Sequence, residues 1–517
     1  MRSMVFHPKN LWLSSAAGRM VFFAVVLMLV FACAINGQSL WIDEACAAFK
    51  ARQPDLAGWW GQMLREKGSD LQMPVYMFWI WLCGKIFGAG ELALRAVNFF
   101  WFAPGLLALL WALSRRVALQ LAVFLAVVTS PFVWSYVNEA RPYAMQLGAS
   151  LFLLAALFHW SENPITTAAK RGWVCGVVMA LVVLAGSSLL GMIWAVAAVA
   201  ILMIVLPVDD FQRLIRRHAG VWLTGLVSLV LLGGYYLWTL KFGARASAVG
   251  ATGWKSPVFI IYELSGFVGL GPGRLEIRES NGQGFQTYGM ALAGFAGLAV
   301  ILSGLAGRQL FQSGQTKKWL AVALWLAMPA TIILAAGLVL HFRVLGRHFT
   351  PLAPVWLFFL AVGVGAAWQW NRLGRAVVIG YFLLCLVSCL SLRFAARHEK
   401  DDYRTAVALA KAALARGQSV WWNADDSGAA YYQLPLATNG VSEHGKALKL
   451  DNPRQKMLLA AGRADVIIVS RHDVYDGHGA VAEFLAATHY RPITNLPAFS
   501  VWERGQIIES KYSQAVK

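Results

Sequence analysis

The amino-acid sequence predicts an all-α polytopic membrane protein with a small C-terminal α/β domain. Hydrophobic residues make up 58% of the 517 residues and charged residues only 14%, and long apolar runs recur throughout the first 393 residues. A soluble protein carries roughly twice that share of charged residues and has no means of burying so much apolar surface. The lipid bilayer is therefore expected to surround most of the chain.

About eleven segments approach the roughly 20 residues that a helix needs to cross a bilayer. They cover residues 20–38, 91–113, 118–134, 141–159, 173–190, 191–207, 220–238, 289–306, 319–339, 351–369 and 376–393. The first run follows Arg19 and is similar to a secretory signal. Because many further spans follow it, we expect an uncleaved first span with the N-terminus in the cytoplasm.

The shorter apolar segment 73–88 decides the topology. If it crossed the membrane, Arg115 and Arg116 would lie outside, although Lys and Arg concentrate in cytoplasmic loops. If it lies in the outer interface, these arginines and the later basic loops become cytoplasmic. We expect the second arrangement, in which much of the net charge of +19 sets the orientation of the chain. Nucleic acid is then not needed to explain the basic charge.

Three stretches are expected on the outer face. They are the external loops 39–90 and 239–288 and the C-terminal residues 394–517. The C-terminal stretch alternates helix-like and strand-like patterns, which is typical of a small α/β domain. We therefore divide the chain into a membrane domain, residues 1–393, and a soluble extracytoplasmic domain, residues 394–517.

An acidic pair, Asp43 and Glu44, follows the first span. Ile42, Ala45 and Phe49 fall on one helical stripe, so the segment is predicted to lie in the interface as an amphipathic helix. Two carboxylates at the membrane surface can act as a general base and its electrostatic partner. The alternative, that they only stabilise the N-terminal end of the helix, stays open.

A second polar cluster lies at an outer helix end and contains Asn138, Glu139, Arg141 and Tyr143. Ionisable groups at the edge of the membrane often mark substrate paths. A solvated turn, with Pro142 beginning the next helix, is the alternative.

A third cluster is basic and contains Arg347 and His348. Guanidinium and imidazole groups suit phosphate oxygens, although basic side chains also extend to lipid headgroups. Lys241 and Arg245 add positive charge in the long loop 239–288. The interfacial segment 73–88 carries aromatic anchors, Tyr76 among them.

Several function classes have no support in the sequence. It contains no P-loop, no GxGxxG after a strand, no HExxH and no GxSxG. The six cysteines are scattered, mostly through apolar runs, without CxxC spacing, so we expect neither a disulfide framework nor a zinc site.

In order along the chain, the polar motifs resemble those of a known family. The matching segments are 40–45 (LWIDEA), 73–76 (MPVY), 91–95 (ELALR), 136–144 (YVNEARPYA) and 346–354 (GRHFTPLAP). This order resembles the GT-C superfamily of polytopic glycosyltransferases, in the family 39-like branch that includes protein O-mannosyltransferases and lipid A aminoarabinose transferases. The sequence has Asn138 where the branch commonly has Gln, and Arg347–His348 where it has Arg-Tyr.

The resemblance implies transfer of a sugar from a polyprenyl-phosphate carrier to a lipid, lipopolysaccharide, glycan or protein acceptor. The reaction would take place on the outer face of the bacterial inner membrane. It implies Asp43 as the base beside Glu44, and Glu139 as a second carboxylate. If a divalent cation is needed, Asp43 and Glu139 would hold it.

The resemblance also implies roles for cations and for positioning residues. The donor phosphate would be bound by Arg141, Arg347, His348, Lys241 and Arg245. Donor and acceptor would be positioned by Tyr76, Arg95, Asn138 and Tyr143.

Two other classes of protein remain as alternatives. A transporter or flippase of lipid-linked sugars should carry ionisable groups or broken helices near the membrane midplane. Here the polar clusters gather at one face, which favours an enzyme. A membrane-anchored binding protein would instead depend on residues 394–517 and tolerate the loss of Asp43.

Overall fold

The computed structural model describes residues 15–163, 170–242, 252–279, 283–314, 316–450 and 455–505. The chain divides into two compact units. The membrane unit comprises residues 1–37 and 50–398, and the C-terminal unit comprises residues 38–49 and 399–517. The C-terminal unit thus includes a short segment from the predicted loop 39–90, which the sequence did not indicate.

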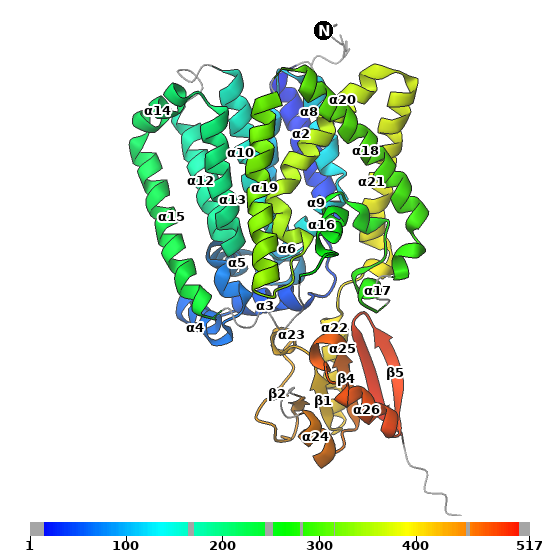
Figure 1. Ribbon diagram of the computed structural model, residues 1–517. Helices are drawn as coiled ribbons and strands as arrows, with labels where there is room; N and C mark the ends of the chain where they lie inside the picture. The colour runs from blue at the N-terminus through cyan, green and yellow to red at the C-terminus, as the bar shows by residue number, and fades with distance from the viewer. Residues whose placement is uncertain are drawn as a thin grey trace, which may run out of the picture. The chain divides into compact units, whose positions relative to one another are not determined.

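Helices form nearly all of the membrane unit (Figure 1). The long or apolar ones are α2 (Ala16–Ala34), α5 (Pro74–Phe87), α6 (Glu91–Ala96), α7 (Phe99–Ala112), α8 (Val117–Val128), α9 (Pro131–Val137), α10 (Tyr143–Glu162), α12 (Arg171–Ser187), α13 (Leu189–Val205), α15 (Ala219–Thr239), α18 (Gly289–Gln312), α19 (Thr316–Val339), α20 (Ala353–Trp370) and α21 (Arg372–Phe394). The shorter ones are α4 (Leu56–Glu66), η1 (Ser69–Gln72), α14 (Val208–Arg217), α16 (Ser256–Leu264), η3 (Phe267–Gly269), α17 (Arg274–Glu279), η4 (Gln283–Gln286), η5 (Gly346–Leu352) and η6 (Ala396–His398). Helix α3 (Ile42–Ala51) crosses the boundary between the two units in the sequence.

Nine predicted spans each coincide with one of these helices, whereas 91–113 covers both α6 and α7 and 118–134 covers α8 and the start of α9. The chain is thus a polytopic helical membrane protein, as predicted. In the described residues, eight helices are long and apolar enough to cross a membrane, or up to ten if each bent pair counts as one span. Helix α12 has 17 residues and falls just below that length. The predicted number of eleven spans therefore stays a prediction.

Contacts between helix ends define two faces of the membrane unit. At one end, Arg19 of α2 donates to the carbonyl of Ser114 after α7 at 2.8 Å. At the opposite end, Arg95 of α6 donates to the carbonyl of Asn36 after α2 at 2.8 Å. The chain therefore crosses once through α2 and once through α6 and α7, with no crossing between them. Helix α5 must then begin and end on the same face, as predicted.

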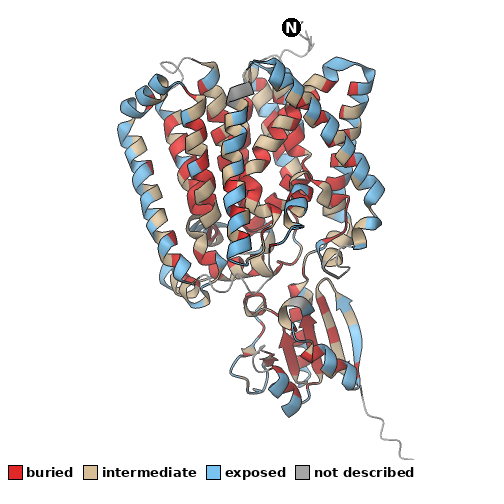
Figure 2. Ribbon diagram, viewed as in Figure 1, coloured by how far each residue is buried: buried red, intermediate tan, exposed pale blue. Residues whose placement is uncertain are grey.

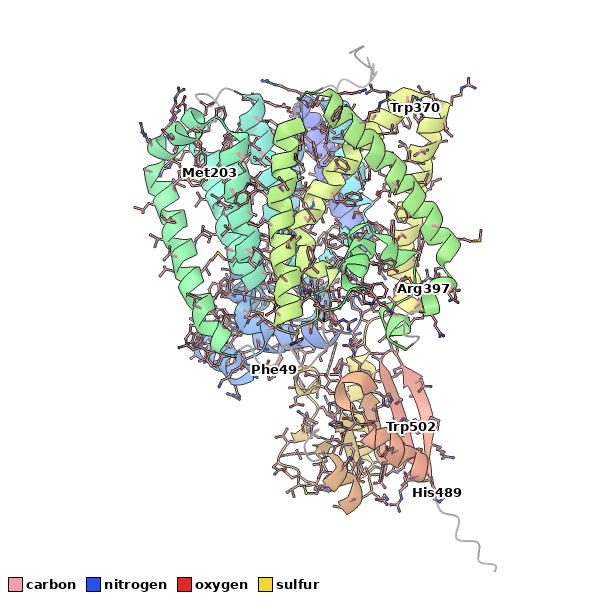
Figure 3. All side chains as sticks on the ribbon, in the orientation of Figure 1. Phe49, Met203, Trp370, Arg397, His489 and Trp502 are labelled. Atoms are coloured by element: carbon pink, nitrogen blue, oxygen red, sulfur yellow. The ribbon has the colours of Figure 1, made fainter. Side chains whose placement is uncertain are left out.

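We name these faces by their residues. The basic face holds Arg19, and there Arg116 also pairs with Glu162 at 2.7 Å. The site face holds Asn36, whose amide donates to Asn138 Oδ1 at 2.9 Å. Trp370 and Met203 lie toward the basic-face end of the bundle and Arg397 toward the site-face end (Figure 3).

Lipid-facing surface and close helix packing account for the burial pattern. The outer helices α15, α18 and α19 expose much of their length (Figure 2), including apolar side chains such as Leu226 and Val230. Helices α7 and α10 approach closely at Gly105 and Gly148, because glycine has no Cβ atom. A Cβ at Gly105 would lie only 2.2 Å from the carbonyl oxygen of Gly148. Small residues permit such contacts between membrane helices.

The C-terminal unit is built on one six-stranded sheet with the order β2-β3-β1-β4-β6-β5. Its strands are β1 (Val420–Asn423), β2 (Leu436–Ala437), β3 (Ala447–Lys449), β4 (Val466–Ser470), β5 (Tyr490–Leu496) and β6 (Phe499–Arg504). Its helices besides α3 are α22 (Tyr403–Ala415), α23 (Asp426–Tyr431), α24 (Gln455–Ala461), α25 (His472–Tyr475) and α26 (Ala480–Ala487). Strands β2, β3, β1 and β4 are parallel, and β6 and β5 are antiparallel. This confirms the predicted small α/β domain.

Candidate functional site

A buried carboxylate and a surface arginine form the centre of the candidate site. Glu139 follows α9 on the site face and is 1% exposed. Arg274 Nη1 lies 2.9 Å from Glu139 Oε1, and the Arg274 side chain is 45% exposed. Within the described residues, Glu139 Oε2 has no hydrogen-bond partner. A buried oxygen of this kind is available to accept a hydrogen bond from a bound molecule.

A second carboxylate, Glu263 of α16, lies in the same region. It accepts hydrogen bonds from the Gly346 amide at 2.5 Å and from the Tyr136 hydroxyl at 3.3 Å. Burial raises the pKa of Glu263, although Arg274, the Gly346 amide and Arg347 act in the opposite direction. Glycine is needed at position 346 because a Cβ there would lie 2.5 Å from Glu263 Oε2.

These residues form one electrostatic cluster around Tyr136. The charges of Glu263, Arg274, Glu139 and Arg347 all act on its phenol. We call these five residues the Glu139–Arg274 cluster. It combines two carboxylates with two guanidinium groups at the site face, which is a suitable composition for binding a phosphate beside a hydroxyl.

Besides Tyr136, the prediction of site residues from the sequence missed two members of this cluster, Glu263 and Arg274. Both come from the long loop 239–288, which folds into α16, η3, α17 and η4 in its described part. The one available signal was the excess of basic residues in a loop predicted to be external, where the positive-inside tendency does not explain them.

The loop that carries Glu263 and Arg274 is docked on the bundle. Arg397 donates to the carbonyls of Gly271 and Gly269, both at 3.1 Å. A Cβ at Gly271 would lie 1.9 Å from the Tyr262 hydroxyl, so only glycine allows this approach. The glycines therefore serve close packing of the loop.

Arg141 is held in a separate ion-pair chain. Its Nη1 lies 2.6 Å from Asp70 Oδ1, and Lys50 Nζ lies 2.8 Å from Asp70 Oδ2. Lys50 also pairs with Glu66. Burial alone would raise the pKa of Asp70, but Lys50 and Arg141 outweigh it and lower the pKa to about 2. Asp70 therefore offsets part of the charge of Arg141, whose predicted phosphate contact stays a prediction.

Three predicted positioning residues belong to the framework of the site face. Arg95 is fully buried and binds the carbonyl and side chain of Asn36, and Asn138 accepts from the Asn36 amide. The Tyr143 ring packs edge-on against Tyr136 at 4.9 Å. Their contacts shape the surroundings of the Glu139–Arg274 cluster.

The remaining predicted residues of the membrane unit are dispersed. Tyr76 is buried on α5. His348 Nδ1 accepts from the Leu345 amide at 3.2 Å, so one ring nitrogen stabilises the start of η5. Lys241 is exposed beyond the end of α15. Arg245 lies outside the described residues.

The acidic pair of the first motif belongs to the C-terminal unit. Asp43 and Glu44 occupy the first turn of α3, as predicted from the helical stripe. Glu44 is fully buried and pairs with Lys400 at 3.0 Å, whereas Asp43 is partly exposed.

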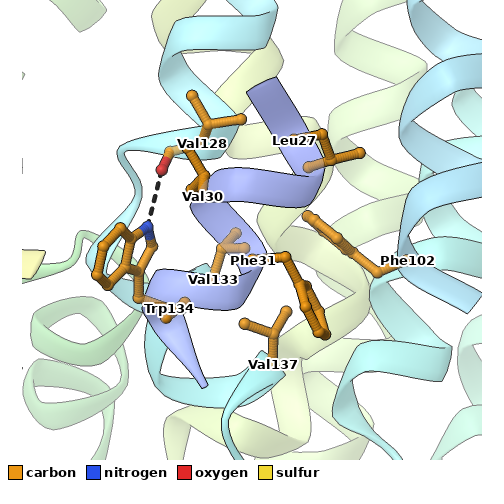
Figure 4. Close-up of a pocket in the computed structure, with 9 residues that line it drawn as sticks. Leu27, Val30, Phe31, Phe102, Val128, Val133, Trp134 and Val137 are labelled. Carbon is orange, nitrogen blue, oxygen red and sulfur yellow. Dashed lines mark hydrogen bonds between the residues drawn. The ribbon is translucent and has the colours of Figure 1, made fainter. Parts of the chain in front are cut away.

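Two further features bear on ligands. In the described part of the chain, no group of three or more His, Cys, Asp or Glu side chains is arranged to hold a metal ion. An apolar pocket lies between α2, α7, α8 and α9 (Figure 4), and its indole donor, Trp134 Nε1, is already bonded to the Val128 carbonyl at 2.8 Å. This pocket offers nothing to recognise a polar group.

No protein-family model and no curated protein sequence matches the chain. Among solved structures, ArnT from Cupriavidus metallidurans in the apo state is similar over 94% of this chain and 98% of its own, with 14% identity and a TM-score of 0.50. The same protein bound to undecaprenyl phosphate has 15% identity over 95% and 99% of the two chains, with a TM-score of 0.47. Arabinofuranosyltransferase AftD from Mycobacteria has 13% identity over 94% of this chain and 40% of its own, with a TM-score of 0.41. The likeness to apo ArnT confirms the GT-C fold that the motif order predicted.

Proposed function

We propose that the chain is an integral membrane glycosyltransferase that moves a sugar from a polyprenyl-phosphate carrier to an acceptor at the site face. The observation that carries this proposal is the Glu139–Arg274 pair on a GT-C fold. It places a buried, half-satisfied carboxylate against the guanidinium of an arginine whose side chain is 45% exposed. A transferase of this kind needs both a hydrogen-bond acceptor for a hydroxyl and cations for a phosphate.

Arg274 and Arg347 are the proposed ligands of the donor phosphate. The leaving lipid phosphate gains negative charge as the glycosidic bond breaks, and planar guanidinium groups bind such oxygens in pairs. Arg274 is preferred to Arg141, because Arg141 is 3% exposed and already paired with Asp70. His348, Lys241 and Arg245 stay secondary candidates from the motif resemblance.

The carboxylates have separate proposed tasks. Asp43 is the proposed base, on the strength of the motif resemblance, and withdraws the proton of the acceptor hydroxyl. The oxygen of that hydroxyl attacks the anomeric carbon, and the phosphate leaves with the electron pair. Glu139 Oε2 accepts a hydrogen bond from donor or acceptor.

The proposed orientation places the basic face in the cytoplasm of a bacterial inner membrane. Arg19, Arg116 and Arg171 all lie at this face or in loops that end there. The positive-inside tendency then puts the site face outside, where no nucleotide is supplied and a lipid-linked donor is required. The acceptor is a lipid, a lipopolysaccharide, a glycan or a protein.

The test compares surface glycans by mass spectrometry in a strain that lacks the gene and in strains that carry variants. We expect one sugar modification to disappear in the deletion strain and to return with the wild-type gene. Arg274→Ala should fail to restore it. Lys255→Ala removes an exposed cation from the same loop and should restore it fully. An unchanged glycan profile in the deletion strain would contradict the proposed function.

A further inference from the structure

The strand order of the C-terminal unit contains a switch point of the kind at which ligands bind in other α/β folds. From β1 the chain runs to β2 and β3 on one side, then crosses to β4 on the other side. The connections thus leave the carboxyl ends of β1 and β4 in opposite directions. In open α/β sheets, ligands bind at this switch point, beyond the carboxyl ends of the strands.

In this unit the residues at that switch point contact the chain's own segment 38–49. Asp425 follows β1, and its Oδ1 lies 3.7 Å from Cys46 Sγ. Arg471 follows β4, and its guanidinium lies 5.9 Å from the centre of the Trp41 ring. Trp41 and Cys46 of the segment therefore contact the residues that follow β4 and β1.

Further contacts dock the segment on the rest of the C-terminal unit. The Leu40 amide donates to the Tyr432 hydroxyl at 3.0 Å, and Ser39 Oγ lies 3.2 Å from the same hydroxyl. The Arg404 amide donates to Ser39 Oγ at 3.2 Å. Ile42 packs against the hydrophobic core beneath. The segment is thus held by backbone, hydroxyl and apolar contacts together.

Arg471 is a buried arginine with an unusual backbone conformation and an ion pair. It adopts φ of 35°, a left-handed conformation that favours glycine over residues with a side chain. Its Nη2 lies 2.6 Å from Asp401 Oδ2, with only 10% of the arginine side chain exposed. In the described residues its Nε has no hydrogen-bond partner. The charge of Asp43 acts on this guanidinium.

Lys400 holds the other acid of the pair. Its ammonium lies 3.0 Å from Glu44 Oε2, and Glu44 is fully buried. Removing Lys400 would leave a buried carboxylate without this counter-charge, which is unfavourable. Lys400 thus pairs with Glu44, and Arg471 lies over the ring of Trp41, two residues before Asp43.

We propose that segment 38–49 occupies the ligand position of the sheet, and that Arg471 and Lys400 are positioning residues for Asp43 and Glu44. This inference rests on the proposed function, because Asp43 is there the base of the transfer reaction. The C-terminal unit then contributes to turnover by fixing the orientation of the acid.

The docking is tested without any activity, by hydrogen exchange with mass spectrometry on the full-length protein in detergent. Arg471→Ala and Tyr432→Phe should speed exchange about tenfold in peptides covering 39–46, each losing roughly one interaction of the segment. Peptides of β1 and β4 should be unchanged. Arg491→Ala removes an arginine that is 74% exposed on β5 and should have no effect.

Unchanged exchange in both variants would overturn the docking. If Arg471→Ala also speeds exchange in the peptides of β1 and β4, the docking is judged from Tyr432→Phe alone, because this variant removes only a single hydroxyl group. A wild-type segment that exchanges as fast as an exposed terminus would equally overturn it.

The positioning role is tested by turnover in membranes from a strain lacking the gene, supplied with lipid-linked sugars extracted from the host. Arg471→Ala should lower kcat by about 100-fold, the effect of a small misplacement of a reacting group, with the donor KM within twofold. Arg471→Lys should restore part of the rate. Wild-type kcat in Arg471→Ala, or a change confined to KM, would overturn the positioning role. If the wild type transfers no sugar, the proposed function fails, and the exchange experiment still decides the docking.

Discussion

At the scale of single residues, neighbouring side chains decide which charges are available. Arg141 and Arg274 are both arginines in segments between apolar runs. Arg141 is 3% exposed and pairs with Asp70, whereas the side chain of Arg274 is 45% exposed and pairs with Glu139. The motif resemblance pointed to Arg141. The sequence could not distinguish the two, because Asp70 lies far from Arg141 along the chain and carries no motif of its own.

The proposed base is tested by Asp43→Asn, which keeps the shape of the side chain and removes its basicity. We expect kcat to fall by about 100- to 10,000-fold, the usual range for loss of a general base. Sugar incorporation into membranes, at equal amounts of inserted protein, measures it. Asp209→Asn, an exposed acid on α14, is the matched control. Full activity in Asp43→Asn would rule out the base.

Asp70 is expected to stabilise the fold rather than the reaction. Asp70→Asn leaves Lys50 and Arg141 with less counter-charge and should destabilise the membrane unit by about 3–5 kcal/mol. Because the pKa of Asp70 is lowered from 3.8 to about 2, this stabilisation is complete above about pH 4 and is lost as the pH falls through 2. Thermal unfolding at several pH values checks it. If the difference in stability between the wild type and Asp70→Asn grew toward acidic pH, the stabilising role of ionised Asp70 would be contradicted.

At the scale of elements, the sequence predicted the helices well because each needs only a local apolar run. It also predicted that α5 stays on one face, because the charge of Arg115 and Arg116 excluded a crossing. It did not predict that loop 239–288 brings Glu263 and Arg274 to the site. That placement depends on close backbone packing at Gly269 and Gly271, which no local pattern reveals.

Helix packing gives a prediction at this scale. Gly148→Ala should destabilise the protein by about 1–3 kcal/mol, because the new Cβ would lie 2.1 Å from the Trp101 carbonyl between α10 and α7. Gly304→Ala on α18, where no atom lies within 4 Å, should leave the midpoint unchanged or raised. The thermal unfolding midpoint of each purified variant measures the difference. Equal midpoints for the two variants would show that α7 and α10 can move apart without loss of stability.

At the scale of the whole molecule, the two faces predict the orientation in the membrane. Alkaline phosphatase, active only outside the cytoplasm, should be inactive when fused after Arg217 on the basic face. Fused after Arg504, at the end of β6, it should be active. Phosphatase activity of intact cells, corrected for fusion protein level, measures this. The reverse pattern would invert the membrane unit and place the proposed reaction in the cytoplasm.

The composition of the C-terminal unit has a consequence for biosynthesis. Residues 38–49 emerge from the ribosome long before residues 399–517, with the whole of residues 50–398 made in between. During that interval Leu40, Trp41 and Ala45, all buried in the finished protein, have no completed domain to receive them. Contacts of such long sequence separation form late and slowly. Segment 38–49 is therefore expected to need a chaperone until residues 399–517 have been made. A chain that ends before β4 is expected to leave these apolar side chains exposed.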